Sequence, residues 1–154
     1  MAKFYSVGVG AGDGSYITLG ALRALEQADI IAVPVKKYGE KSTALEIIRK
    51  EFDTDKKEIS ELEFRMSGDT KIREESRRTS AEKLISALKD GKDVAMITLG
   101  DVSVYSTCSY FHKGVKNAGF ELEIIPGITS FCAAADKAQI SLCEGNESVA
   151  IIPS

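Results

Sequence analysis

Residues 93–101 read DVAMITLGD, an apolar run that ends in glycine and aspartate. The run is short, rich in residues that favour strands and polar only at its two ends, so it predicts a buried central strand over Asp93–Leu99. A glycine directly after a strand permits a positive φ and a close approach of the backbone to a ligand or to another loop. The stretch therefore predicts a strand that delivers a loop, beginning at Gly100 and Asp101, to one edge of a sheet.

Outside this stretch, predicted strands and helices alternate along the chain. The other predicted strands are Phe4–Val9, Asp29–Pro34, Glu58–Phe64, Leu122–Ile125 and Ser148–Pro153. The predicted helices are Thr18–Ala28, Ser42–Arg49, Asp69–Leu88, Tyr105–Asn117 and Ser130–Ala138. We expect Pro34 to close its strand, Thr18 and Ser42 or Thr43 to cap their helices, and Gly91 to end the longest helix. Such βα units with short connections predict an α/β fold, with a mostly parallel sheet covered by helices on both faces.

Composition and charge limit the classes of function. The chain has 154 residues, 44% hydrophobic and 28% charged, which suits one globular domain with its own core. Its formal net charge of −3 speaks against broad binding to nucleic acid or to a membrane surface. No apolar run approaches the ~20 residues that span a bilayer. Because strand-like residues begin almost at the N-terminus, with no signal-peptide pattern, we expect a soluble, cytoplasmic protein.

The cysteines and the single histidine do not indicate a metal site. Cys108, Cys132 and Cys143 cannot all pair within one chain, and none belongs to a CxxC motif. We expect reduced cysteines that lie mostly in the core of a cytoplasmic protein. His112 is expected to be structural or exposed within its helix, because metal sites normally need several such side chains.

Three loops that contain glycine follow three of the predicted strands. They are Gly8–Asp13, Gly100–Thr107 and Pro126–Ser130. Ligands of parallel sheets bind beyond the carboxyl ends of the strands, so we expect the three loops to converge at that edge. Each loop taken alone is also compatible with a simple tight turn. Asp13 stands where a dinucleotide-binding GxGxxG motif needs glycine, and the GKS or GKT of a phosphate-binding P-loop is absent.

These loops resemble the motifs of the tetrapyrrole methylases, a family of S-adenosylmethionine-dependent enzymes. The family's GxGPGD motif is similar to Gly8–Asp13, and the Thr-Leu pair that follows it is similar to Thr18–Leu19. Its Leu-Gly-Asp-x-x-x-Tyr-Ser-Thr motif is similar to Leu99–Thr107, and its Ile-Pro-Gly-(Val/Ile)-Thr-Ser motif to Ile125–Ser130. The resemblance covers the whole chain. Ala11 replaces the motif proline, so the first loop lacks a fixed φ and is expected to be looser.

Within the family, the chain is most similar to C20-methyltransferases that act on precorrin-2 or cobalt-factor II in cobalamin (vitamin B12) biosynthesis. The similar segments are Val33–Lys37, Ala44–Arg49, Tyr105–Tyr110 and Ser130–Ala135. The resemblance implies methylation of the tetrapyrrole at C20, with S-adenosylmethionine as donor and S-adenosylhomocysteine as product. Methyl transfer depends mainly on positioning, and the sequence assigns no catalytic side chain.

The family has two domains with the active site in the cleft between them, and this chain resembles the first. We interpret residues 1–145 as the N-terminal α/β domain, and 146–154 as a linker and the first strand of a second domain that is missing. The resemblance further implies a homodimer. We expect the chain alone to be inactive. The alternatives are a relative that acts on another tetrapyrrole, on rRNA or on a protein histidine, and a non-catalytic α/β fragment.

The resemblance implies that S-adenosylmethionine contacts the second and third loops and the tip of the first. The implied cofactor-binding residues are Ala11, Leu99, Gly100, Asp101, Val104, Ser106, Thr107, Thr129 and Ser130. The Asp101 carboxylate suits an ammonium group or a ribose hydroxyl, and the hydroxyls of Ser106 and Thr129 suit a carboxylate. The alternative for Asp101 and Thr129 is that they only cap the helices that follow them.

A tetrapyrrole substrate of this class carries many carboxylates and therefore needs cationic partners. Our candidates for substrate binding are Gly10, Asp13, Lys36 and Tyr105. Lys36 follows the second predicted strand, at the edge of the sheet where we expect the loops. Arg65, Arg73 and Arg77 are further candidates, for which a solvated charged face is the alternative.

Overall fold

Five parallel strands form the centre of the protein, whose computed structural model describes residues 1–153. The strands are β1 (Lys3–Gly8), β2 (Ile30–Val35), β3 (Glu58–Glu63), β4 (Val94–Thr98) and β5 (Glu121–Ile125), in the spatial order β3-β2-β4-β1-β5. Every pairing between neighbouring strands is parallel, so the predicted parallel sheet is confirmed. The strand predicted from residues 93–99 is indeed the central one, with β1 and β2 on its two sides.

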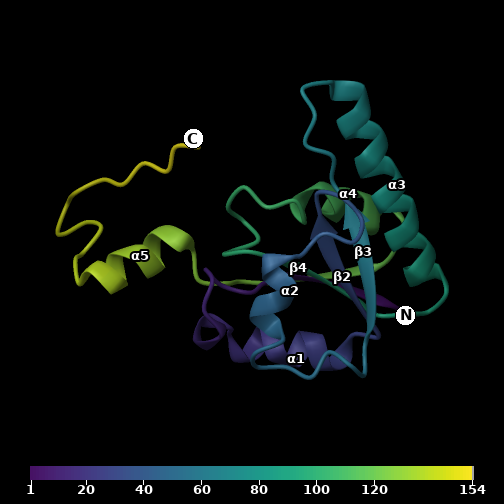
Figure 1. Ribbon diagram of the computed structural model, residues 1–154, viewed down its shortest axis with the longest axis horizontal. Coiled ribbons are helices and arrows are strands. Elements are labelled where there is room, and N and C mark those ends of the chain that lie inside the picture. Colours follow the sequence, from purple (N-terminus) through teal and green to yellow (C-terminus); the bar gives the residue numbers. More distant parts are fainter. Residues whose placement is uncertain (154) are drawn as a thin grey trace.

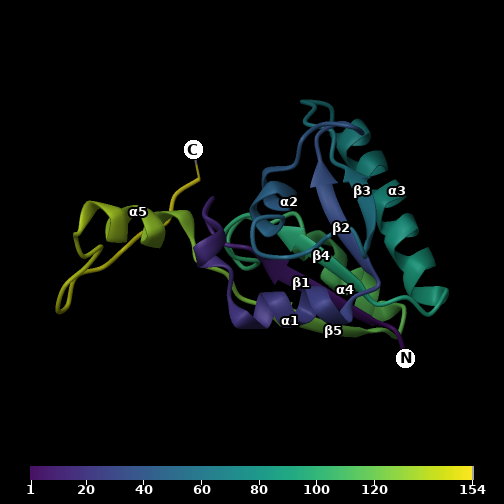
Figure 2. The same ribbon diagram turned by 60° about the horizontal axis from the view of Figure 1, so that its bottom comes forward.

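Helices cover both faces of this sheet, as predicted. The helices of the described residues are α1 (Leu19–Gln27), α2 (Thr43–Ile48), α3 (Thr70–Lys89), α4 (Ser109–Asn117) and α5 (Ser130–Ala138), with a short 3-10 turn at Gly14–Tyr16. Figures 1 and 2 show α1 and α2 on one face and α3 and α4 on the other, whereas α5 stands to one side of the sheet. No helix within residues 1–153 is long and apolar enough to cross a membrane.

Alternation along the strands divides the core into two layers. Successive side chains of a strand point to opposite faces. In β1, Val7 is buried with α1 and α2, and Phe4 is buried with α3 and α4. In β4, Ile97 and Met96 divide in the same way. Both faces of the sheet are therefore apolar, which explains why the predicted strands are nearly continuous hydrophobic runs.

Hydroxyl side chains begin two helices as predicted. Thr18 Oγ1 accepts a hydrogen bond from the Ala21 N–H at 3.1 Å, and Ser42 Oγ accepts one from the Leu45 N–H at 3.4 Å. Each bond satisfies an amide that a helix leaves without an internal partner. Gly91 directly follows the C-cap residue of α3, Asp90, and has the positive φ of +79° that is typical of a helix end, so the predicted stop is confirmed.

The second strand does not close at proline, contrary to our prediction. β2 continues through Pro34, which lies opposite Leu62 of β3, and ends at Val35. Its pairing with β4 has already ended at Ala32, so Pro34 lies where the strand has a partner on one side only. A residue without an N–H is tolerated at such a place.

The fourth helix begins at Ser109 and not at Tyr105, so the predicted start is wrong. Tyr105 has a φ of +48°, in the left-handed region that a right-handed helix cannot include. The Ser106 hydroxyl accepts a hydrogen bond from the Cys108 N–H at 3.1 Å. Such a local side-chain bond competes with helical pairing and holds the residues before Ser109 in a turn.

The strand predicted at Ser148–Pro153 is also wrong. Residues 139–153 contain neither helix nor strand, and all of them are exposed. Gln139 ends α5 in the left-handed conformation, and the segment after it stays on the α5 side of the molecule, away from both edge strands (Figure 1). A strand cannot form there because no sheet edge lies beside it. The predicted domain division at residues 145 and 146 stays a prediction, and residue 154 lies outside the described residues.

The expectation of mostly buried cysteines is wrong for two of the three. Cys108 is buried, whereas Cys132 on α5 and Cys143 in the segment after it are exposed, because that part of the chain stands apart from the sheet. Burial raises the pKa of the Cys108 thiol to about 11, which keeps it protonated at neutral pH. His112 is half-buried, with Nε2 2.9 Å from Ser6 Oγ, and burial lowers its pKa. It occupies a structural position in α4.

Candidate functional site

The three glycine-containing loops meet at the carboxyl edge of the sheet, as the sequence predicted. The Gly100 N–H donates to the Gly10 carbonyl at 2.8 Å, and the Gly10 N–H donates to the Gly100 carbonyl at 3.2 Å. The third loop joins them through the Gly127 N–H, which donates to Asp101 Oδ2 at 2.8 Å. We call this hydrogen-bonded meeting point of Gly8, Gly10, Gly100, Asp101 and Gly127 the loop junction.

Close approach of the backbones requires glycine at two positions of the loop junction. A Cβ atom on Gly127 would lie 2.1 Å from the Gly100 carbonyl oxygen, and one on Gly8 would lie 2.7 Å from the same oxygen. Neither distance is compatible with close packing of separate atoms, so a side chain at either position would push the loops apart. Gly100 itself has a φ of +65°, which glycine adopts without strain. Each of the three motifs therefore contains a glycine that the close approach of the loops or its own backbone conformation requires.

Asp101 fastens the second loop to the third and does not cap α4. Its Oδ1 accepts hydrogen bonds from the N–H and the hydroxyl of Ser103, and its Oδ2 accepts one from Gly127. The helix-capping alternative is wrong, since α4 begins at Ser109 without a side-chain cap. Burial raises the pKa of the Asp101 carboxyl, but the hydrogen bonds to the charged form outweigh burial, and the pKa lies below its ordinary value.

An open cavity of about 400 Å³, which we call the junction hollow, lies beside these loops. All predicted cofactor residues except Ser106 and Thr107 line it, together with Gly12, Thr43 and Phe131. Leu99 is 49% exposed, so the hollow is open to solvent. Its volume lies in the range of small-molecule sites.

Thr129 presents a hydroxyl that the protein itself does not use. The residue occupies the N-cap position of α5, yet its side chain makes no capping bond. Its Oγ1 is buried and has no hydrogen-bond partner among the described residues. Leaving a buried hydroxyl unpaired costs about 1–3 kcal/mol, so the position suits a ligand atom that pairs with it. The alternative that the side chain of Thr129 only caps a helix is wrong.

Three predicted residues have side chains or backbone groups engaged elsewhere. Ser106 is buried and its hydroxyl is bound to the Cys108 N–H. The backbone N–H and carbonyl of Gly10 are hydrogen-bonded to Gly100 in the loop junction. Asp13 is exposed and accepts hydrogen bonds from the N–H and the hydroxyl of Ser15, which lower the pKa of its carboxyl. None of the three lines the junction hollow.

The other predicted residues line a second cavity of about 450 Å³ next to the junction hollow. Lys36, Tyr105 and Thr107 belong to it. Thr43 and Leu99 line both spaces, so the two lie next to each other. The structure therefore places most predicted cofactor residues in the junction hollow and Lys36 and Tyr105 in the cavity beside it, while the predicted cofactor residues Leu99 and Thr107 also line that second cavity.

Sequence reasoning missed Gly12, Thr43 and Phe131 as lining residues of the junction hollow. Thr43 was considered only as a helix cap, and nothing in the chain's pattern indicates that the first turn of α2 borders the loop junction. Gly12 lies inside the first motif and Phe131 directly after the third. Their closeness to these motifs was the one available signal.

The lining of the junction hollow determines which chemistry it can perform. It offers backbone groups, the Asp101 carboxylate, the hydroxyls of Thr43, Thr129 and Ser130, and apolar side chains, but no lysine, histidine or cysteine. Because no histidine or lysine in the lining is available to activate these hydroxyls, the lining is suited to binding and orienting a small molecule. Within residues 1–153, no group of three or more His, Cys, Asp or Glu side chains is placed to hold a metal ion.

Comparisons with known proteins identify relatives of the chain. Residues 3–154 match the family described as "Tetrapyrrole (Corrin/Porphyrin) Methylases". The chain is 45% identical to the "Probable cobalt-precorrin-2 C(20)-methyltransferase" of Methanocaldococcus jannaschii, covering 98% of this chain and 64% of the relative. It is 34% identical to the "Cobalt-precorrin-2 C(20)-methyltransferase" of Salmonella typhimurium, covering 97% of this chain and 62% of the relative. It thus spans less than two thirds of the length of either relative.

A solved structure shows the same fold. The crystal structure of a cobalt-precorrin-4 methyltransferase superposes with a TM-score of 0.66 at 25% identity, covering 94% of this chain and 53% of that one. The family match over nearly the whole chain agrees with the three motifs and with their convergence at one edge of the sheet. The chain belongs to the tetrapyrrole methylases.

Proposed function

We propose that the protein is an S-adenosylmethionine-dependent methyltransferase that methylates precorrin-2, or its cobalt form, at C20 in cobalamin biosynthesis. The observation that carries the proposal is the 45% identity, over 98% of this chain, to a relative whose name states that reaction. The loop junction supports it, because this chain builds a small-molecule hollow from the residues of all three family motifs. Because the chain spans 64% of that relative, we propose the activity for the whole protein.

The cofactor of this proposal binds in the junction hollow. The backbone around Leu99–Asp101 and at Val104 contacts its amino-acid part, and the unpaired hydroxyl of Thr129 donates to its carboxylate. Asp101 acts first by holding the loops together, and the remaining acceptor capacity of its carboxylate suits an ammonium or ribose hydroxyl. Ala11 and Ser130 complete the walls.

The residues of the hollow contribute position and not covalent chemistry. When bound, S-adenosylmethionine would supply the methyl group: its S–CH3 bond would break as a bond to the electron-rich C20 carbon forms, S-adenosylhomocysteine would leave, and the C20 proton would be released to water. Because C20 is itself the nucleophile, no nucleophilic side chain is needed. Holding reacting atoms ~3–3.5 Å apart in line can lower a barrier by roughly 7–11 kcal/mol. The loop junction is suited to this task, since three backbones that touch without intervening side chains form a rigid wall.

A methyl-transfer assay tests the proposed reaction. We would fuse this chain to the part of the M. jannaschii relative that it does not match, and supply labelled S-adenosylmethionine with precorrin-2 or cobalt-precorrin-2. We expect label at C20 with the fusion and none with the 154-residue chain alone. Label only on a later precorrin would assign another tetrapyrrole. Label only on rRNA or on a protein histidine would assign the other branches of the family.

A binding experiment separates this proposal from a non-catalytic fragment. Titration of the isotope-labelled chain with S-adenosylhomocysteine, followed by NMR, should shift the amides of Gly100 and Thr129. We expect weak binding, because the hollow is open to solvent. An unchanged spectrum at millimolar ligand, together with no transfer by the fusion, would indicate a fragment without catalytic function.

The proposal also includes a homodimer and a cytoplasmic location. Cys108, Cys132 and Cys143 are free, which suits a reducing compartment. Light scattering during size-exclusion chromatography measures the mass directly, and a monomer at micromolar concentration would contradict the dimer for this chain.

A further inference from the structure

The junction hollow is one end of a longer trough along the carboxyl edge of the sheet. The second cavity shares Thr43 and Leu99 with the hollow. A third cavity, of about 400 Å³, shares Phe64, Met66 and Thr107 with the second. Because neighbouring cavities have lining residues in common, the three lie side by side. We call this row of cavities, from the loop junction to the first half of α3, the trough.

The far end of this trough, which we call the arginine end, is lined by Arg65, Arg73 and Arg77. Arg73 and Arg77 lie four residues apart on α3 and so share one face of the helix. Arg73 donates hydrogen bonds to the Ser67 carbonyl at 2.9 Å and to Thr70 Oγ1 at 3.2 Å. The Arg77 guanidinium lies over the Tyr110 ring, 3.9 Å from its centre. Neutral groups therefore hold both arginines in place.

The charge of these two arginines is not balanced by an acidic partner. Neither Arg73 nor Arg77 forms an ion pair within residues 1–153. Arg65 is different, because Glu63 binds its Nε at 2.8 Å. Glu74 is the one carboxylate among the residues that line the arginine end. Two like charges four residues apart on a helix repel each other, and an anionic ligand would relieve this repulsion.

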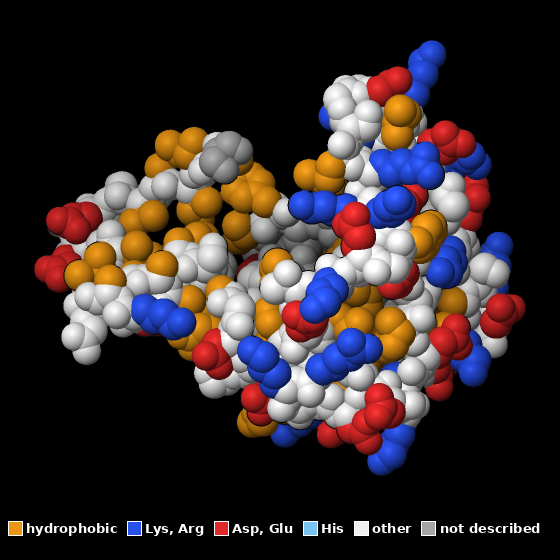
Figure 3. Space-filling model, viewed as in Figure 1, with side chains coloured by type: hydrophobic (Ala, Val, Ile, Leu, Met, Phe, Trp, Pro, Cys, Tyr) orange, Lys and Arg blue, Asp and Glu red, His pale blue; other side chains and the backbone are white. Residues whose placement is uncertain are grey.

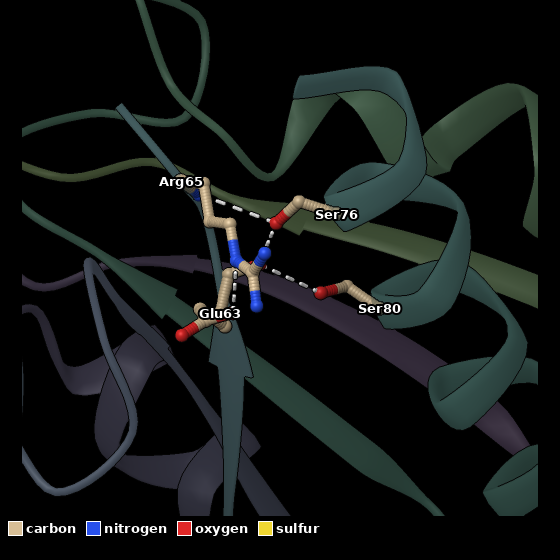
Figure 4. Close-up of polar contacts among 4 residues, drawn as sticks. All are labelled: Glu63, Arg65, Ser76 and Ser80. Carbon is tan, nitrogen blue, oxygen red and sulfur yellow. Dashed lines mark hydrogen bonds and ion pairs between the residues drawn. The ribbon is translucent and has the colours of Figure 1, made fainter. Parts of the chain in front are cut away.

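Two serines fix the orientation of α3 (Figure 4). Ser76 Oγ donates to the Glu63 carbonyl at 2.5 Å and accepts from the Arg65 N–H at 3.2 Å. Ser80 Oγ, one turn later, donates to the same carbonyl at 3.1 Å. These buried hydroxyls bind one stripe of the helix to the end of β3. The adjacent stripe, which carries the two unpaired arginines, is thereby directed into the trough.

We propose that the arginine end binds peripheral carboxylates of the tetrapyrrole, with Arg73 and Arg77 as positioning residues that orient the macrocycle toward the junction hollow. The inference rests on the proposed function and adds where the acidic side chains of the substrate bind. A guanidinium offers parallel N–H donors that match a carboxylate. The middle cavity, with Phe64, Met66 and Lys36 in its lining, has apolar surface for the ring and a further cation.

The surface of the molecule is compatible with this orientation. In Figure 3, hydrophobic side chains gather on the arm that carries α5 and the following segment. Lys and Arg side chains gather on the opposite side, over the upper part of the body that contains the start of α3. An amphiphilic ring with acidic substituents would meet both kinds of surface in the space between.

Titration with uroporphyrin, a porphyrin that carries many carboxylates, tests the arginine end on the 154-residue chain. We expect the Arg73→Met and Arg77→Met variants each to weaken binding by about fivefold, and the double variant by about tenfold or more, as for the loss of charge-assisted hydrogen bonds. Arg77→Lys should recover part of the affinity, and added salt should reduce the difference between variants. Quenching of the porphyrin fluorescence measures the affinity.

Arg78→Met is the matched control. Arg78 lies beside Arg77 on α3, is exposed and pairs with Glu82 at 2.9 Å outside the trough. It should change uroporphyrin affinity by less than about twofold, as expected for an exposed ion pair. Circular dichroism melts establish that all variants fold. Uroporphyrin octamethyl ester, which lacks the acidic groups, should not distinguish the double variant from the wild type.

The outcomes separate this inference from the proposed function. If wild-type chain fails to bind uroporphyrin, or if the double variant binds as tightly as Arg78→Met, the arginine end is not a carboxylate site, even when S-adenosylhomocysteine still shifts Gly100 and Thr129. If S-adenosylhomocysteine does not bind but the arginine effect is present, the proposed function fails and the anion site remains. In the fused enzyme, the double variant should raise KM for the tetrapyrrole more than it lowers kcat.

Discussion

The two ends of the strands differ in what happens to their polar groups. At the amino edge of the sheet, the Lys3 N–H donates to Asp93 Oδ1 at 2.7 Å, and the Asp93 N–H donates to Asp29 Oδ2 at 2.9 Å. Lys57 Nζ donates to the Glu26 and Ala28 carbonyls, each at 2.7 Å. These groups are all engaged in holding the fold together.

At the carboxyl edge, polar groups remain available to a ligand. The Thr129 hydroxyl has no partner within the described residues, and the arginine end contains cations without ion pairs. The loop junction at this edge is satisfied internally. The comparison shows that one end of the sheet contributes mainly stability, while the other combines a rigid junction with unsatisfied groups. This division is expected of an α/β sheet that binds ligands beyond its strand ends.

The largest predicted effect is at the loop junction. Gly127→Ala should lower the free energy of unfolding by about 3 kcal/mol or more, because its Cβ would lie 2.1 Å from the Gly100 carbonyl oxygen. Gly114→Ala is the matched control, since a Cβ there meets nothing within 4 Å and the residue lies inside α4. The control should raise stability by about 0.4–1 kcal/mol. Urea denaturation measures both, and a loss below about 1 kcal/mol for Gly127→Ala would mean that the loops separate easily.

Asp101→Asn should cost about 1–3 kcal/mol, because an amide cannot accept hydrogen bonds through both of its terminal atoms. Asp93→Asn at the amino edge should cost less than about 0.5 kcal/mol, since one oxygen suffices for its bond from Lys3. Equal losses in the free energy of unfolding for Asp101→Asn and Asp93→Asn, in the same denaturation experiment, would contradict the difference between the two edges of the sheet.

The stability difference between wild type and Asp101→Asn should also depend on pH. The folded pKa of Asp101 lies below its ordinary value, so its stabilising contribution is complete above the ordinary pKa of about 3.9. It is lost as pH falls through the lower folded pKa. Unfolding at pH 7 and at pH 3 should therefore show a full and a reduced difference, and a larger difference at pH 3 would have the wrong sign.

A smaller effect distinguishes two threonines at helix N-termini. Thr18→Val should cost about 1 kcal/mol, because its hydroxyl caps α1, and should leave S-adenosylhomocysteine binding unchanged. Thr129→Val should leave stability unchanged or raise it by up to about 1–3 kcal/mol, because it removes a buried hydroxyl that has no partner within residues 1–153. It should weaken S-adenosylhomocysteine binding by about tenfold, the loss of one hydrogen bond to a charged group. NMR titration and thermal melts give both quantities, and equal stability losses would contradict the assignment.

The parts of the fold that were predicted correctly have local causes. The buried run 93–99 follows from apolar burial, and the positive φ of Gly10, Gly12 and Gly100 is a local backbone property that glycine favours. The start of α4 was missed because the left-handed φ of Tyr105 is set by its loop. The strand at 148–153 was wrong for a different reason. Its residues favour a strand, but pairing depends on a sheet edge that α5 keeps at a distance.

In the candidate site, too, some residues could be predicted from the sequence and others could not. Its motif residues were predictable, since the carboxyl ends of parallel strands share an edge. The contribution of Thr43 was not, because it depends on how α2 packs beside the loops. Sequence alone also could not separate Arg65 from Arg73 and Arg77. That distinction arises from Glu63, whose side chain binds one arginine at the end of β3 and leaves the other two unpaired.

The position of Thr43 also affects whether molecules bound in neighbouring cavities of the trough can contact each other. Together with Leu99 it lines both the junction hollow and the middle cavity, so these two residues lie at the boundary between the two cavities. A bulkier residue at position 43 would fill the boundary between the junction hollow and the middle cavity, while the other lining residues of both cavities stay unchanged. On the proposed function, methyl donor and acceptor would then each still be bound, yet would not meet.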